Sequence, residues 1–76
     1  MKLNITLSGI ALDLAGKEII PIELNDPETL LKTISTTVPG LENYFLLISI
    51  NGKFTENYSS LKPGDNVLVF SPIAGG

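Results

Sequence analysis

The sequence predicts an α+β domain: a small mixed sheet that a single helix covers on one face. Short runs of alternating apolar residues recur near both ends of the chain, and an amphipathic helical segment lies between them. A chain of 76 residues has room for only one domain and one core. Because one helix can cover only one face of a sheet, the opposite face is expected to lack a second layer.

The first half of the chain is expected to form two strands. Residues 3–7 alternate apolar and polar side chains, which is typical of a half-buried strand, and Gly9 ends the pattern. Residues 10–14 form an apolar bridge, expected as a helical turn. Residues 18–24 return to period two, and Pro21 removes a backbone donor there, so this segment is expected as an edge strand or a bulged one.

A helix start follows at Asp26, which can cap free amides, and at Pro27, which suits the first helical position. The proline and glycine at positions 39 and 40 end the helix. Apolar residues at three- and four-residue spacing predict its buried stripe, namely Leu30, Leu31, Ile34 and Val38.

The second half of the chain predicts three more strands. Residues 45–50 are an apolar run expected as an inner strand, with Phe45 in the core or at its rim. Asn51-Gly52 predicts a type I′ turn into a short return strand over residues 53–56. Residues 67–70 form the last strand, expected parallel to the first strand and in the middle of the sheet.

This order of elements is that of the β-grasp, or ubiquitin-like, fold. We therefore expect a β-grasp domain over residues 1–72, followed by a flexible Gly-Gly tail over residues 73–76.

The composition excludes most catalytic chemistry. The chain has no cysteine, histidine or arginine, so it lacks thiolate–zinc sites, imidazole bases and bidentate phosphate clamps. Its carboxylates show no spacing typical of acid–base catalysis or of a metal cluster. We expect no metal site, no bound cofactor and no enzyme activity of the chain itself.

Charge and hydropathy also narrow the partners. Five separated lysines and a net charge of −3 argue against nucleic acid. No apolar run approaches the ~18 residues of a membrane span, and no signal peptide is recognisable. The absence of cysteine suits a reducing compartment, so we expect a cytoplasmic protein with no membrane partner.

The last residues are the candidate reactive group. Gly75 and Gly76 would place a free carboxylate on a slender backbone that fits a narrow slot. Residues 73–76, including Ile73 and Ala74, reach about 13–14 Å when extended, and Pro72 restricts where the flexibility begins. Two terminal glycines also arise by chance or at a cloning boundary.

A docking patch is the second candidate. If Val67 and Val69 face the helix, then Leu68 and Phe70 face the uncovered side of the sheet. There we expect them to form an apolar surface with Pro72, which Leu47 joins. The alternative is that Phe70 folds over a sheet edge as part of an ordinary core.

Residues 61–76 resemble the end of small β-grasp sulfur carriers of the MoaD/ThiS type. In these proteins a Leu-x-x-Gly-Asp turn, here residues 61–65, opens the last strand, and a Pro-x-x-Gly-Gly tail, here residues 72–76, closes the chain. The likeness is greatest to the small subunit of molybdopterin synthase, which shares a long first hairpin. The chain departs from that subunit at Leu12-Asp13, where an Arg-Glu pair is common, and at Ser71-Pro72, where Pro-Pro is common.

The resemblance implies a mechanism and partners. An E1-like enzyme would use ATP to adenylate the Gly76 carboxylate, and sulfur would replace the adenylate to leave a thiocarboxylate. The large catalytic subunit of molybdopterin synthase would then use this sulfur to convert precursor Z to molybdopterin.

Three other functions stay open. The carrier could serve thiamin, another sulfur metabolite or tRNA thiolation. The chain could instead be a ubiquitin-like modifier, conjugated to lysines through Gly76. It could also be a plain β-grasp interaction module whose terminal glycines have no role.

Overall fold

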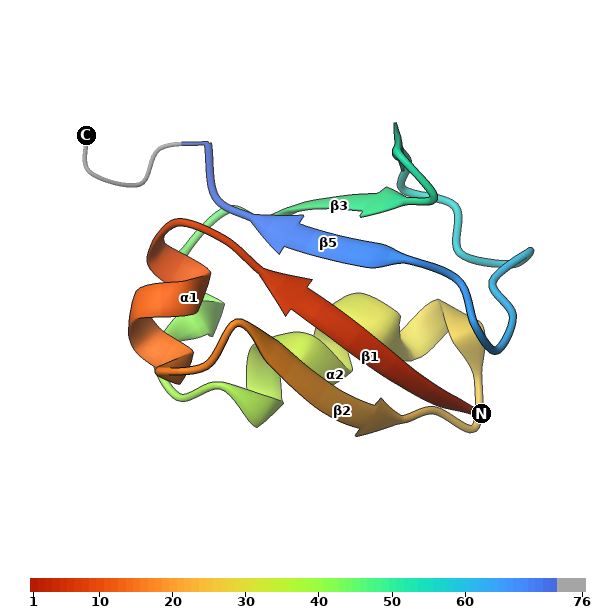
Figure 1. Cartoon of the computed structure of the whole chain (residues 1–76), viewed down its shortest axis with the longest axis horizontal. Helices are drawn as coiled ribbons and strands as arrows, with labels where there is room; N and C mark the ends of the chain where they lie inside the picture. The colour runs from red at the N-terminus through yellow and green to blue at the C-terminus, as the bar shows by residue number, and fades with distance from the viewer. Residues whose placement is uncertain (73–76) are drawn as a thin grey trace.

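The computed structural model describes residues 1–72, which form one five-stranded mixed sheet with its helices on one face and at one end (Figure 1). The strands are β1 (Lys2–Leu7), β2 (Ile19–Glu23), β3 (Leu47–Ile50), β4 (Lys53–Phe54) and β5 (Val67–Phe70). Their order across the sheet is β2-β1-β5-β3-β4. Strand β5 runs parallel to its neighbour β1, whereas β1–β2, β3–β5 and β3–β4 are antiparallel pairs. The expected β-grasp fold and the central parallel pair are confirmed.

The main helix begins as one 3₁₀ turn and continues as an α-helix. The turn is η1 (Pro27–Thr29) and the α-helix is α2 (Leu30–Thr37). The Asp26 carboxylate caps the start by accepting a hydrogen bond of 3.0 Å from the Glu28 amide. Helix α2 lies behind the sheet in Figure 1. A further 3₁₀ turn, η2 (Leu41–Asn43), leads towards β3.

The apolar bridge after β1 is longer than one helical turn. It forms the six-residue helix α1 (Ile10–Ala15), which contacts β1 and β5 and lies at the end of the sheet where both strands finish (Figure 1). Gly16 ends this helix with φ of 73° and donates to the Leu12 carbonyl at 2.9 Å.

Pro21 and Asn51 lie where their local rules predict. Pro21 is in β2, an edge strand of the sheet. Asn51 and Gly52 both have positive φ, 52° and 86°, as a type I′ turn requires. This two-residue turn sets Ile50 opposite Lys53 and Ser49 opposite Phe54.

The core lies between the sheet and α2. Its buried side chains come from alternate positions of the strands and from one stripe of the helix, with contributions from α1 and two loops: Leu3, Ile5, Leu7, Ala11, Ile20, Ile22, Leu24, Leu30, Ile34, Val38, Leu41, Ile48, Tyr58, Leu61, Val67 and Val69. Two sequence-based assignments to the buried set are wrong. Leu31 is 38% exposed, and Phe45 is 62% exposed because β3 begins only at Leu47 and Phe45 precedes it.

Candidate functional site: an apolar patch on the open sheet face

The face of the sheet opposite α2 carries the candidate docking residues. Along β5, Val67 and Val69 are buried, whereas Leu68 and Phe70 are half-buried and point to the other side. Pro72 follows as an exposed residue at the end of the described chain. The structure therefore places Leu68 and Phe70 on the open face of β5, with Pro72 two residues further along the chain.

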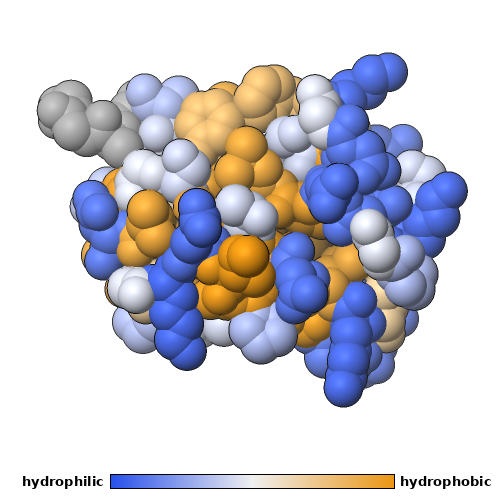
Figure 2. Space-filling model, viewed as in Figure 1, coloured by the Kyte–Doolittle hydropathy of each residue, from blue (hydrophilic) through white to orange (hydrophobic). Residues whose placement is uncertain are grey.

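Two further side chains complete this surface. Leu47 lies directly opposite Phe70 across the β3–β5 pair, which confirms its predicted position. The ring of Phe54, from β4, contacts the ring of Phe70 edge to face, with centroids 5.4 Å apart and planes at 66°. We call Leu47, Phe54, Leu68 and Phe70 the open-face patch. Figure 2 shows hydrophobic surface gathered over β3 and β5 on this side of the molecule.

Burial of Ser49 shows how closely the patch is packed. Ser49 points to the open face but is only 6% exposed. Its partners across the sheet are Leu68 on β5 and Phe54 on β4, so apolar side chains flank the serine on both sides. The open face is thus uncovered by any helix and still locally close-packed, which gives a partner a formed surface to contact.

Phe54 is the residue that sequence reasoning missed. The signal was present in the hairpin: a two-residue turn at Asn51-Gly52 fixes Ser49 opposite Phe54, and residues directly opposite share a face. Since Ser49 lies two residues after Leu47, the same face holds Leu47 and Phe54. Extending the strand alternation across the turn would have found it.

The open-face patch has no titratable group, so it can bind but cannot perform acid–base chemistry. In addition, residues 1–72 contain no cluster of three or more His, Cys, Asp or Glu side chains that could hold a metal ion. The predicted tail residues Ile73, Ala74, Gly75 and Gly76 lie outside the described residues.

Ser71 lies on the core side at the point where β5 ends. It is 5% exposed, and its hydroxyl is buried with no hydrogen-bond partner among the described residues. The next residue, Pro72, is exposed, so the chain passes from core to surface within one peptide unit. This change lies beside the open-face patch, because Phe70 immediately precedes Ser71.

A network of polar bonds holds the other end of β5. The Asp65 carboxylate accepts from the Lys62 amide at 2.9 Å and from the Asn51 side-chain amide at 3.1 Å, and both bonds lower the Asp65 pKa. The Asn51 side-chain oxygen accepts from the Asn66 amide at 2.9 Å. These bonds tie the β3–β4 hairpin to the loop before β5.

Comparison with known proteins identifies the family. The ThiS family model matches residues 5–76. No curated protein sequence matches the chain. In the part of the chain that the structure describes, no helix has the length and apolar character needed to cross a bilayer.

Solved structures share the fold over nearly the whole chain. SAMP1 from Haloferax volcanii, a small archaeal modifier protein, has a TM-score of 0.80 at 17% identity, with both chains covered in full. A proposed molybdopterin converting factor subunit 1 from Pyrococcus furiosus has a TM-score of 0.81 at 23% identity, covering 96% of this chain and 99% of that one. A chain from a complex of subunits 1 and 2 of molybdopterin-converting factor from Helicobacter pylori gives a TM-score of 0.67 at 25% identity. The match covers 100% of this chain and 100% of that one.

Proposed function

The chain belongs to the ThiS family of ubiquitin-like sulfur carriers, and we propose that it carries sulfur as a thiocarboxylate on Gly76. The observation that carries the proposal is the family match, which spans residues 5–76 and so includes Gly75 and Gly76. As a carrier, the chain is a non-catalytic partner, and the enzymes that load and unload it supply the catalytic groups.

Loading takes two steps, each with a defined leaving group. A terminal carboxylate with a pKa near 3.5 is ionised at neutral pH and is a poor electrophile. Its oxygen therefore attacks the α-phosphorus of ATP on an E1-like enzyme, and pyrophosphate leaves. A hydrosulfide ion from the sulfur donor then attacks the Gly76 carbonyl carbon, AMP leaves, and the terminal oxygen has been exchanged for sulfur.

The open-face patch has a separate role in this proposal. Leu68, Phe70 and Pro72, with Leu47 and Phe54, dock the carrier on its partner, while Ile73, Ala74 and Gly75 thread the partner's active site. Once the body is docked through this surface, the tail is already held near the partner's active site. Threading then costs less translational and rotational entropy than it would for a free tail. Glycine at the last two positions keeps the threaded path narrow.

For the sulfur acceptor, we propose molybdopterin biosynthesis with a larger catalytic subunit as the partner. The H. pylori structure supports this choice, since it is a complex of subunits 1 and 2 of molybdopterin-converting factor and its matching chain is 25% identical over the full length. Transfer of the sulfur to precursor Z, with water supplying the replacing oxygen, would regenerate the carboxylate. Both loading and donation are placed in the cytoplasm, where ATP is available.

Two alternatives keep the same activated terminus. The family match itself suits a carrier for thiamin or another sulfur metabolite. The shared fold with SAMP1, a modifier protein, suits conjugation of Gly76 to lysine amines. All three routes require adenylation of Gly76 and differ only in the nucleophile that follows.

The test uses variants that change the tail and leave the body intact. We expect deletion of Gly76, or Gly75→Val, to abolish thiocarboxylate formation in the presence of the adenylating enzyme, ATP and sulfur donor, with an unchanged melting temperature. The matched control is Ser60→Val, which adds the same side chain at an exposed loop position without positive φ and should load normally. Normal thiocarboxylate formation by the Gly76-deleted chain would remove the basis of the proposal. Glycyl-glycine remnants on lysines of other proteins would assign the chain to the modifiers.

A further inference from the structure

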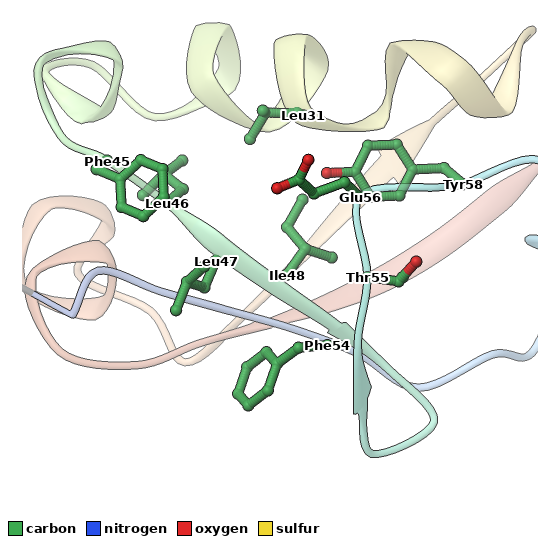
Figure 3. Close-up of a pocket in the computed structure, with 9 residues that line it drawn as sticks. All are labelled: Leu31, Phe45, Leu46, Leu47, Ile48, Phe54, Thr55, Glu56 and Tyr58. Carbon is green, nitrogen blue, oxygen red and sulfur yellow. The ribbon is translucent and has the colours of Figure 1, made fainter.

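A second apolar surface lies on the opposite side of the β3 edge from the open-face patch. It is a cavity of about 590 Å³, which we call the edge groove. Its helix-side wall is formed by Leu31, Ile48 and Tyr58, and Phe45 and Leu46 close one end (Figure 3). Leu47 and Phe54 also line it, and Figure 3 shows Phe54 on the other side of β3 from Leu31. The edge groove therefore continues round the strand edge to the open-face patch.

The backbone at this edge is only partly covered. Strand β4 has two residues, and beyond it the Thr55 amide donates to the Ile48 carbonyl at 3.1 Å. In β3, the backbone groups of the odd-numbered residues Leu47 and Ser49 point towards β5. Backbone groups alternate in direction along a strand, so those of Leu46 point away from β5, towards the edge of the sheet. Leu46 takes part in none of the strand pairs of the described residues. An added strand could bond there.

The other edge of the sheet is protected against such pairing. The Leu7 amide donates to the Glu18 carbonyl, and the Leu24 amide donates to the Met1 carbonyl. In β2 and the residues that flank it, the even-numbered backbone groups therefore point towards β1. Pro21 is odd-numbered, therefore faces the free edge, and has no amide hydrogen to offer. The β2 edge lacks a backbone donor at Pro21, whereas the β3 edge offers the backbone groups of Leu46. This difference favours the β3 edge as the one that accepts another strand.

The charge of the edge groove is negative. Glu56 is its one charged lining residue, and Figure 3 shows the Glu56 side chain extending between Tyr58 and Leu31. Burial raises the pKa of Tyr58, and the nearby carboxylates of Glu56 and Glu28 raise it further. Glu56 is exposed at the rim of the groove, so a lysine or arginine of an occupant would gain a modest pairing energy there that an apolar side chain would not.

We propose that the edge groove binds an extended apolar segment of a partner protein, which adds as a strand beside Leu46 and places a lysine or arginine against Glu56. A second copy of the chain fits poorly. Symmetric edge-to-edge pairing would bring two Glu56 carboxylates towards one another, and each copy carries a net charge of −3. The site is separate from the tail and does not depend on the chemistry at Gly76.

The probe is a short acetylated and amidated peptide of alternating valine and threonine with a central lysine, titrated into the isotopically labelled full chain. We expect the amide signals of Leu31, Leu46 and Ile48 to move together on one binding curve. The same peptide with a central glutamate should bind about threefold more weakly. Glu56→Gln should remove this difference between the peptides, whereas Glu42→Gln, an exposed carboxylate on η2, should retain it.

Several results would overturn the proposal: no movement of these signals, equal affinity for the two peptides, or shifts confined to the open-face patch or to β2. So would a dimer in sedimentation equilibrium whose formation moves the groove signals without peptide. A chain lacking Gly75 and Gly76 should bind the lysine peptide as the full chain does. The two proposals can therefore fail separately. A chain that is not loaded with sulfur should still bind the lysine peptide, and a chain that does not bind the peptide could still be loaded with sulfur.

Discussion

At the scale of single residues, Ser71 is the one described side chain whose buried polar atom lacks a hydrogen-bond partner. A buried hydroxyl without a partner loses its bonds to water and gains none in return. We predict that Ser71→Ala raises the free energy of unfolding by about 1 kcal/mol, measured by urea denaturation.

The control for this prediction is Ser59→Ala. The Ser59 hydroxyl donates to the Asn57 side chain at 2.7 Å, so its removal should give no gain in stability. A loss of stability in Ser71→Ala would mean that the hydroxyl is bonded, and the present description of this residue would be wrong.

Asp65 gives a prediction for pH. Its folded-state pKa is lowered, first by the Lys62 amide and then by the Asn51 amide, from an ordinary value of 3.8. A carboxylate with a lowered pKa stabilises the fold above its unfolded pKa, and this contribution is lost as the pH falls through the folded value. Asp65→Asn should therefore lower the melting temperature at pH 7, and the difference from the unmodified chain should shrink below about pH 3.8.

This comparison needs a carboxylate outside the network. Glu18→Gln serves, because Glu18 is exposed and takes no part in the hydrogen bonds that join Asp65 to Lys62 and Asn51. The prediction would fail if the difference in melting temperature between Asp65→Asn and the unmodified chain stayed constant as the pH falls. The effect of Asp65 would then not depend on its negative charge.

At the scale of elements, strands β4 and β5 meet through the rings of Phe54 and Phe70. Edge-to-face pairs contribute about 0.5–1.5 kcal/mol beyond burial, and exposure of Phe54 places this pair at the lower end. We predict a coupling of about 0.5 kcal/mol in a double-mutant cycle of Phe54→Ala and Phe70→Ala.

The same variants separate docking from folding. Either alanine should weaken binding to the partner subunit by about tenfold or more, since aromatic side chains at the centre of an interface carry much of its energy. Ile19→Ala is the matched control, because Ile19 is 53% exposed on β2, at the far edge of the sheet. Equal losses in all three variants would argue against a specific role for the open-face patch.

Much of each element could be predicted from the chain, because the signals were local. Asp26 caps the first turn, Asn51-Gly52 forms the expected hairpin, and Pro21 marks an edge strand. The expected burial of a side chain was wrong where it depends on which element packs against that side chain. Leu31 has helical spacing, yet it is at the rim of α2 beside the edge groove. Tyr58 lies in a polar segment, yet its ring packs into the core.

The candidate site was predicted only in part for a related reason. Alternation along β5 placed Leu68 and Phe70 on the open face correctly. Phe54 lies on the same face only because of its register with Ser49, which is a property of two strands together. Burial of Ser71 likewise depends on how the end of β5 packs on its surroundings, which no single segment encodes.

At the scale of the whole molecule, the fold and the proposed chemistry are separate. A sheet with helices on one face leaves the other face free for binding, and the body has neither a metal-binding cluster in its described residues nor a cysteine or histidine anywhere. We propose that recognition lies in the open-face patch and reactivity in the terminal carboxylate.

The intact mass of the chain after incubation with its adenylating enzyme, ATP and a sulfur donor tests whether Gly76 carries the sulfur. We expect a mass increase equal to one exchange of oxygen for sulfur, located by fragmentation at Gly76 and absent from the Gly76-deleted chain. An unchanged mass in the full chain under conditions that load a known carrier would contradict it.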